Sequence, residues 1–176
     1  FKEKPKETGL LNEIGSSVSL GLEIIAQMRE LETMIASGKE LRTVSIREVL
    51  TKIQEKYSPF ILKVTGDATI LADADLESVL NNIVTNASAH EKVTEMEIEI
   101  SENSKAVTVA CKDTGPGIPN DIKPMIFDEG YKYGDTGNTG LGLFIVKQVI
   151  ERYGGTVRVE DNTPSGAIFV LTFKKP

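Results

Sequence analysis

Cysteine, histidine and tryptophan are nearly missing from this chain of 176 residues, which has one cysteine, one histidine and no tryptophan. A single cysteine excludes an internal disulfide and is typical of a reducing compartment such as the cytoplasm, which we expect to be the location. Because Cys111 lies in an apolar segment, we expect it in the core.

Long apolar runs and excess positive charge are also lacking. No apolar stretch is long enough to cross a membrane, so we expect no membrane segment. The formal net charge of −6 argues against non-specific binding of nucleic acid. The length suits one domain with an appendage, and 40% hydrophobic residues suffice for a core. The chain begins at Phe1 without a signal-like stretch, so we expect a fragment of a longer protein.

Glycine is concentrated in two clusters at borders of expected secondary structure. The first, residues 113–117, follows an alternating apolar run that predicts a strand. The second, residues 139–142, precedes an apolar segment that predicts a largely buried helix. Glycines at such borders let backbone N–H groups approach a ligand, and a helix N-terminus favours phosphate. Either cluster alone reads as an ordinary loop, whereas the pair favours a nucleotide site.

Two asparagines mark a third element of this site. Apolar residues recur at helical spacing over residues 74–90, and Asn82 and Asn86 share one face because they are four positions apart. Asparagine is a mediocre helix former. The pair is therefore either a solvated flank or a source of amide oxygen for Mg²⁺ beside substrate phosphates.

Together these segments resemble the ATP-binding catalytic domain of sensor histidine kinases, in the ATPase superfamily that includes gyrases and certain chaperones. The resemblance covers roughly residues 45–176, and its four motifs stand in the family's order, which makes it specific. They are an asparagine box at 80–90, a first glycine box at 113–117, a phenylalanine box at 126–130 and a second glycine box at 140–143. Residues 159–169 also resemble the family's terminal hairpin.

The resemblance implies a role for each residue of the site. Asp113 would accept a hydrogen bond from the adenine amino group, although it could also close an Asx turn. Asn86 would hold Mg²⁺, and Asn82 would line the same site. The other residues expected to bind ATP are His90, Gly115, Gly117, Ile118, Phe127, Lys132, Thr139, Gly140, Leu141, Gly142 and Leu143. Lys132 is the candidate phosphate contact, with a merely solvated side chain as the alternative.

Three features qualify this assignment. Ala167 stands where many relatives carry a hydroxyl residue near the adenine, so water or another residue must substitute. The segment 130–134 lacks the family's Phe-x-Arg pattern, which leaves the basic phosphate partner open. The long stretch between the glycine boxes is expected to be a lid over ATP, with a floppy surface loop as the alternative.

Residues 9–37 predict one long helix with a wide apolar stripe. The stripe comprises Leu10, Leu11, Ile14, Val18, Gly21, Leu22, Ile24, Ile25, Met28, Leu31 and Ile35. Such a helix needs a partner, which is a missing helix, a second copy or both. Gly38 is expected to end it. The segment 34–41 resembles the junction after the second helix of the kinase dimerisation hairpin, which implies that the first helix, with the phosphorylated histidine, lies upstream of Phe1.

His90 is the one histidine, and it ends the asparagine box. Acceptor histidines of the family lie on the first hairpin helix, so we expect His90 to be a wall of the nucleotide site or a helix C-terminal residue. No residue of this chain is thus a certain catalytic residue.

The expected fold is α+β: a two-layer sandwich in which three helices cover one face of a mixed, mostly antiparallel sheet of about five strands. Helices are expected at 45–57, 74–90 and 140–153, and strands at 61–64, 69–72, 96–100, 105–112, 156–160 and 167–173. Ser45 and Glu48 predict a capping box, Asp73 or Asp75 a second cap, and Gly66-Asp67 a hairpin joining the first two strands. Residues 1–44 would be the hairpin helix and linker, and residues 45–176 the catalytic domain.

The resemblance implies a protein-histidine kinase with ATP and Mg²⁺ as cofactors. Its partners would be a second copy, bound through the N-terminal helix as a homodimer, and a response-regulator receiver domain. Two alternatives remain open. One is a serine/threonine kinase of the same superfamily that acts on a partner protein, and the other is a nucleotide-gated interaction module without transfer activity.

Overall fold

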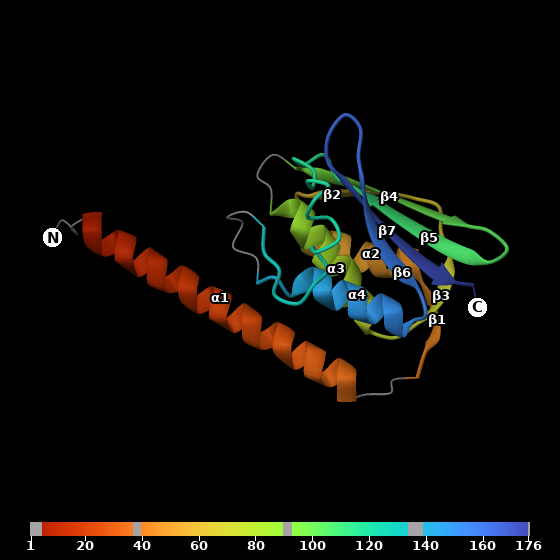
Figure 1. Ribbon diagram of the computed structural model, residues 1–176, viewed down its shortest axis with the longest axis horizontal. Helices are drawn as coiled ribbons and strands as arrows, with labels where there is room; N and C mark the ends of the chain where they lie inside the picture. Colours follow the sequence, from red (N-terminus) through yellow and green to blue (C-terminus); the bar gives the residue numbers. More distant parts are fainter. Residues whose placement is uncertain (1–4, 37–39, 90–92, 134–138, 176) are drawn as a thin grey trace.

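A long helix precedes an α/β sandwich in this chain (Figure 1). The computed structural model describes residues 5–36, 40–89, 93–133 and 139–175. The elements in chain order are α1 (Pro5–Ala36), β1 (Arg42–Ser45), α2 (Ile46–Lys56), β2 (Ile61–Thr65), β3 (Thr69–Ala72), α3 (Asp75–Ser88), β4 (Glu95–Glu102), β5 (Ala106–Lys112), α4 (Gly142–Arg152), β6 (Thr156–Asp161) and β7 (Ala167–Lys174).

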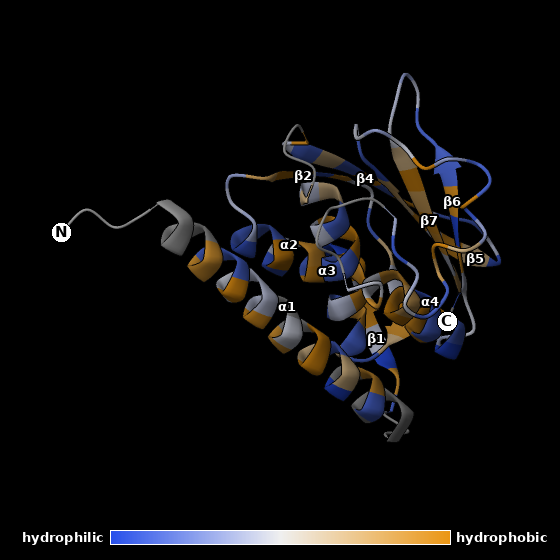
Figure 2. Cartoon of the chain, turned by 60° about the vertical axis from the view of Figure 1, so that its left-hand side comes forward, coloured by the Kyte–Doolittle hydropathy of each residue, from blue (hydrophilic) through white to orange (hydrophobic). Residues whose placement is uncertain are grey.

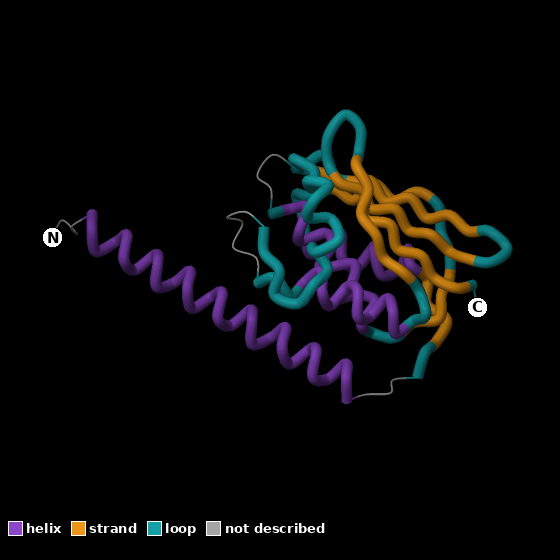
Figure 3. The backbone as a smooth tube through the Cα atoms, in the orientation of Figure 1, coloured by secondary structure: helices purple, strands orange, loops and turns teal. Residues whose placement is uncertain are grey.

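Five strands form the main sheet in the order β2-β4-β5-β7-β6. The β2–β4 pair is parallel and the other three pairs are antiparallel. Helices α2, α3 and α4 cover one face, as the separate purple and orange layers of Figure 3 show. Along β4, Met96 and Ile98 point into the core while Glu97 and Glu99 face outward, which is the alternation of a half-buried strand. The expected α+β sandwich is confirmed.

The core lies between this sheet and the three helices. Ile98, Val109 and Leu171 of the sheet and Ile83 of α3 are fully buried. Cys111 joins them, as the apolar pattern predicted. Burial raises the pKa of its thiol to about 12, so Cys111 is a neutral packing residue rather than a reactive thiolate.

The predicted hairpin of residues 61–64 and 69–72 is wrong. Strand β3 pairs with β1 in a separate two-stranded sheet, and β2 pairs with β4. Gly66 has a φ of +77°, and an added Cβ there would lie 1.9 Å from the carbonyl oxygen of Ile100. The guanidinium of Arg47 donates to the carbonyl of Gly66. The backbone at Gly66 is thus held against β4 on one side and α2 on the other, and β3 leaves the main sheet.

The helix caps follow the sequence more closely. The N–H of Glu48 donates to the Ser45 hydroxyl at 3.2 Å, which confirms Ser45 as the N-cap of α2. At the start of α3 the N–H of Asp75 donates to Oδ1 of Asp73 at 2.9 Å. Asp73 therefore accepts a hydrogen bond from the first residue of α3.

The long helix α1 lies on the helical side of the sandwich, away from the sheet (Figures 1 and 2). Leu31 packs against the domain core. Seven apolar residues of the stripe are instead 51–66% exposed: Leu10, Leu11, Ile14, Val18, Leu22, Ile25 and Met28. None of the helices in the described ranges combines the length and hydropathy of a membrane span. Gly38 lies outside the described residues.

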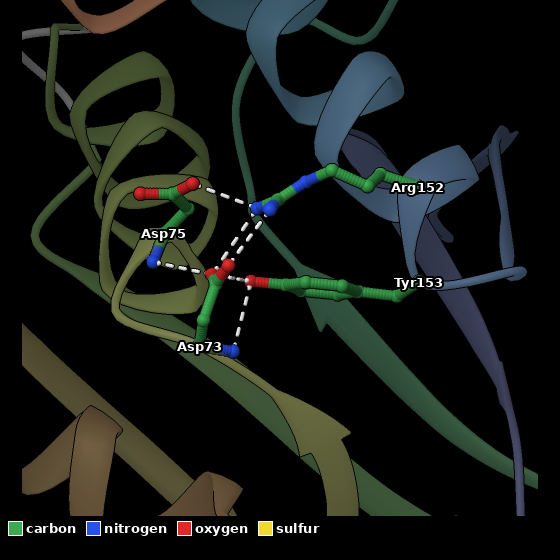
Figure 4. Close-up of polar contacts among 4 residues, drawn as sticks. All are labelled: Asp73, Asp75, Arg152 and Tyr153. Atoms are coloured by element: carbon green, nitrogen blue, oxygen red, sulfur yellow. Dashed lines mark hydrogen bonds and ion pairs between the residues drawn. The ribbon is translucent and has the colours of Figure 1, made fainter. Parts of the chain in front are cut away.

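Four polar residues tie the C-terminal end of α4 to the N-terminal end of α3 (Figure 4). The Arg152 guanidinium reaches Asp73 and Asp75, each at 2.7 Å, and the Tyr153 hydroxyl donates to Asp73. The guanidinium also lies 5.1 Å from the centre of the Tyr153 ring. This group, which we name the helix clasp, fixes how far α3 and α4 are shifted along each other.

The helix clasp predicts an acid-sensitive stability. Burial acts to raise the pKa of Asp73, but hydrogen bonds from Arg152 and Tyr153 outweigh it and hold that pKa below the ordinary 3.8. A carboxyl group with a lowered pKa contributes stability above the unfolded-state value, and that stability is lost as the pH falls through the folded-state value. We expect the free energy of unfolding to decline below about pH 4 as Asp73 takes up its proton.

Urea denaturation of Asp73→Asn at several pH values checks this. The variant should be about 2 kcal/mol less stable at pH 7, because Arg152 loses one of its two charge partners and keeps only Asp75, and its stability should depend less on pH below 4. Asp121→Asn, which alters an exposed loop carboxylate, is the control. Equal acid dependence of Asp73→Asn and the unaltered chain would contradict the assignment.

Candidate functional site

A cavity of about 340 Å³ opens where α3, the loop after β5, the start of α4 and β7 meet. One residue of α1, Gln27, also lines it. The lining residues are Gln27, Asn82, Thr85, Asn86, Ala87, Asp113, Pro116, Gly117, Ile118, Ile122, Ile126, Tyr131, Lys132, Tyr133, Gly140, Gly142, Leu143, Ala167 and Phe169. Its walls are largely apolar, with few polar groups, as in typical small-molecule sites.

Asp113 lies at one end of the cavity, directly after β5, and is only 6% exposed. Its Oδ1 accepts hydrogen bonds from the N–H groups of Gly115 at 2.8 Å and Ala167 at 3.1 Å. Its own N–H donates to the Ala167 carbonyl at 3.0 Å. Within the described ranges, the hydrogen bonds to this carboxylate reach Oδ1 and none reaches Oδ2. Asp113 also lines the cavity. The Asx turn uses Oδ1, so Oδ2 can still accept a hydrogen bond from a ligand.

Gly166 makes this arrangement possible. Its φ is +116°, and an added Cβ would lie 2.0 Å from the carbonyl oxygen of Asp113. A neighbouring residue adds support, since the side-chain amide of Asn162 donates to that carbonyl at 2.7 Å. The hairpin of β6 and β7 thus holds Asp113 through backbone contacts that tolerate no side chain at Gly166.

Asn82 and Asn86 line the cavity from α3. The Asn82 amide nitrogen lies 3.5 Å from the Ser78 hydroxyl, while its oxygen lies 3.0 Å from the position that a Cβ on Gly142 would occupy. The oxygen therefore faces the start of α4. Within the described ranges no three His, Cys, Asp or Glu side chains form a metal cluster. The amide oxygens of the two asparagines fit a Mg²⁺ ion whose other ligands are phosphate oxygens and water, and not an ion held by protein ligands alone.

The second glycine cluster forms the end of the cavity near α4. Gly140 has a φ of +77°, and its carbonyl accepts from the N–H of Gly130 at 3.1 Å. Helix α4 begins at Gly142 without a side-chain cap. The first N–H groups of a helix have no partner within it, so the start of α4 can donate to an anion.

The apolar walls belong to the loop after β5, to α4 and to β7. Ile118 and Leu143 line the cavity as expected. Phe127 does not line it. Its ring is buried and meets the ring of Phe169 edge-on, with centroids 6.5 Å apart. Phe127 therefore supports the wall from behind and anchors the loop.

Nine expected site residues line the cavity: Asn82, Asn86, Asp113, Gly117, Ile118, Lys132, Gly140, Gly142 and Leu143. Four expected residues do not line the cavity but lie directly behind its lining. Gly115 contacts Asp113, Phe127 contacts Phe169, Thr139 contacts Gln27, and Leu141 contacts Thr139. His90 and residues 134–138 of the expected lid lie outside the described residues. Sequence reasoning had not placed Gln27, Thr85, Tyr131 or Tyr133 in the site. Gln27 lies beside the apolar stripe of the N-terminal helix. Only the stripe indicated a contact surface in the sequence, so Gln27 was not expected in the site.

Comparisons with known proteins agree with the fold. Residues 72–176 match the family model "Histidine kinase-, DNA gyrase B-, and HSP90-like ATPase". Sensor protein SrrB of Staphylococcus aureus is 37% identical over 108 residues, which are 57% of this chain and 18% of that protein. The chain thus spans less than a fifth of the curated relatives it matches.

Two solved structures align along nearly the whole chain. Full-length ShkA in complex with AMPPNP has a TM-score of 0.71 and 28% identity, covering 98% of this chain and 39% of that one. Histidine kinase ThkA in complex with response regulator protein TrrA has a TM-score of 0.72, covering 100% of this chain and 53% of that one. At 21% identity, the second likeness concerns the fold alone.

The fold and the cavity define a sandwich-type ATPase domain with a nucleotide site between helices and loops. The chain belongs to the histidine kinase-, DNA gyrase B-, and HSP90-like ATPase family, and it contains the catalytic ATPase domain of a sensor histidine kinase.

Gly166 gives a direct test of the Asp113 geometry. Gly166→Ala should destabilise the fold by about 3 kcal/mol or more, since a side chain there meets both an unfavourable φ and the Asp113 backbone. Urea denaturation measures the loss. Gly15→Ala is the matched control, because nothing lies within 4 Å of an added Cβ at that helical position. A Gly166→Ala variant as stable as the control would refute the close contact.

Proposed function

We propose that this chain binds Mg-ATP and donates its γ-phosphoryl group to a histidine on a dimerisation helix, for relay to an aspartate of a response regulator. The observation that carries the proposal is that the two ends of the cavity present different polar groups. One end presents the unpaired Oδ2 of Asp113, and the other presents Asn82, Asn86 and the uncapped start of α4. A single ligand that fits both ends has an amino-bearing base and a polyphosphate.

The Asp113 end favours adenine over guanine. A carboxylate oxygen fixed beside apolar walls accepts a hydrogen bond from an exocyclic amino group. Adenine offers this group where guanine carries a carbonyl oxygen, which a carboxylate would repel. Ala167 contributes its backbone N–H to Asp113 rather than a hydroxyl to the base, so the carboxylate provides the polar recognition on this side.

The other end would hold the phosphates and the metal. Gly140, Gly142 and Leu143 would donate backbone N–H groups to phosphate oxygens, and Lys132 would add a positive charge. Asn86, with Asn82 beside it, would hold Mg²⁺ through amide oxygen. The ion, when bound, neutralises the charge that develops on the transferred phosphoryl group.

The chain's own contribution to transfer is therefore binding and positioning. Asp113 fixes the base, the start of α4 orients the phosphates, and the apolar walls exclude water. No described residue of the cavity is placed as a general base for an acceptor imidazole. Transfer then depends on a histidine delivered by a helix that is not among the described elements.

The exposed apolar stripe of α1 offers a surface on which that helix could pack. Seven large apolar side chains on one helix are costly in water, and a parallel or antiparallel helix pair covers such a stripe. We assign residues 1–44 to a dimerisation helix and linker and residues 45–176 to the catalytic domain. The proposed assembly is a homodimer through α1, with a response-regulator receiver domain as second partner and the cytoplasm as location.

Calorimetry with nucleotides tests the site. Asp113→Ala should abolish measurable ATP binding because it removes the acceptor for the base, and GTP should compete poorly with ATP for the unaltered chain. Asn86→Ala should weaken ATP binding about tenfold when Mg²⁺ is present and little when it is absent. Glu55→Ala, at an exposed position of α2 outside the cavity lining, is the control. Equal competition by GTP would remove Asp113 from base recognition.

Phosphorylation assays test the reaction. The isolated 176-residue chain should bind ATP without stable self-phosphorylation, because its one histidine belongs to the asparagine box. A separate polypeptide with a histidine-bearing dimerisation helix should accept an acid-labile, base-stable label from it. Label on His90 of the isolated chain would overturn the acceptor argument. Acid-stable label on a partner's serine would indicate a serine/threonine kinase instead.

A further inference from the structure

Among the described residues, Gln27 is the one lining residue of the cavity that lies outside the main domain. It belongs to α1, away from residues 72–176 that match the family, and its half-buried side chain lines the nucleotide cavity. Helix α1 contacts α4 directly. The long helix therefore supplies part of the wall of a site that the sequence assigned to the catalytic domain alone.

Thr139 connects Gln27 to the second glycine cluster. The Thr139 hydroxyl donates a hydrogen bond to Oε1 of Gln27 and accepts one from the N–H of Leu141 at 3.2 Å. Thr139 is only 6% exposed. Two hydrogen bonds in series thus join α1 to the backbone at the start of α4, and they fix the orientation of the Gln27 carboxamide.

The free part of Gln27 is a hydrogen-bond donor. With Oε1 engaged by Thr139, the amide nitrogen retains two N–H donors, and no described residue accepts from them. This end of the cavity is poor in positive charge, since Lys132 is the only cation among the described lining residues and its side chain is exposed. A neutral donor beside the glycine cluster therefore matters more here than in a site rich in arginine.

We propose that Gln27 is a ligand of the outermost phosphate of bound ATP, so that α1 and the catalytic domain share the nucleotide site. This inference rests on the proposed function, because it requires phosphates at the α4 end of the cavity. Binding free energies are reciprocal. ATP therefore holds α1 against the domain, and a movement of α1 that removes Gln27 weakens ATP binding.

Three variants of the 176-residue chain separate a phosphate ligand from a structural tether. Gln27→Ala removes both the donor and the bond to Thr139. Gln27→Glu keeps an oxygen for Thr139 but replaces the donor with a negative charge. Ala26→Glu places the same charge at the preceding position of α1, which is exposed and does not line the cavity, and is the matched control.

Calorimetry with ATP and with ADP in the presence of Mg²⁺ gives the readout. We expect Gln27→Ala to lose about tenfold in ATP affinity, the effect of one hydrogen bond to a charged group. Gln27→Glu should lose more than Gln27→Ala because the carboxylate repels phosphate. ADP affinity should change less than about twofold in both variants, which also shows that the folded site is intact. Ala26→Glu should bind both nucleotides normally.

Two results would contradict the assignment of Gln27 as a phosphate ligand. If Gln27→Glu binds ATP as the unaltered chain does, the residue only tethers Thr139. If ATP and ADP affinities fall together, the effect is structural rather than a contact with the outermost phosphate. An unaltered chain that binds neither nucleotide would refute the proposed function instead, so the two failures are distinguishable.

Discussion

The pairing of α3 with α4 is the constraint on which the site depends. These helices run antiparallel, and the helix clasp joins them at one end through Arg152, Asp73 and Asp75. At the start of α4, the Asn82 amide oxygen lies 3.0 Å from the position that a Cβ on Gly142 would occupy. The clasp sets the longitudinal position of the helices, and that position decides whether the asparagine face meets the start of α4. A charge cluster far from the cavity thereby determines its geometry.

A second constraint is independent of the helices and belongs to the sheet. Asp113 ends β5, and its carboxylate is held by backbone N–H groups of Gly115 and Ala167 rather than by side chains. Backbone donors on two ordered segments lose little entropy when they bind, so the carboxylate is preorganised for a ligand. The requirement for glycine at 166 follows from the same contact. The sheet thus fixes the Asp113 end of the cavity, and the pair of α3 and α4 fixes the other end.

Local chemistry was readable from the sequence and long-range pairing was not. The Ser45 cap and the shared face of Asn82 and Asn86 depend on residues within four positions, so periodicity predicts them. The partner of β3 depends on the contact of Gly66 with Ile100, which no local pattern encodes, and the expected hairpin was wrong. The position of Gln27 in the cavity depends likewise on how a helix outside the domain packs against Thr139. Four ordered motifs located most of the cavity because each carries its own glycine or amide chemistry.

The distribution of charge explains why such packing has consequences for function. A chain with a net charge of −6 gives no general attraction to a polyphosphate, and the described lining of the cavity offers one exposed lysine. The remaining donors are neutral, namely backbone N–H groups, amides and the hydroxyls of Thr85, Tyr131 and Tyr133, and their contribution depends steeply on distance and direction. A site of this kind responds to small movements of the elements that carry the donors.

In this chain those elements are α4 and α1, and α1 bears the exposed apolar stripe that any partner helix would engage. Contacts made along that stripe and contacts made to phosphate therefore act on the same rigid helix, which is the physical requirement for one to influence the other.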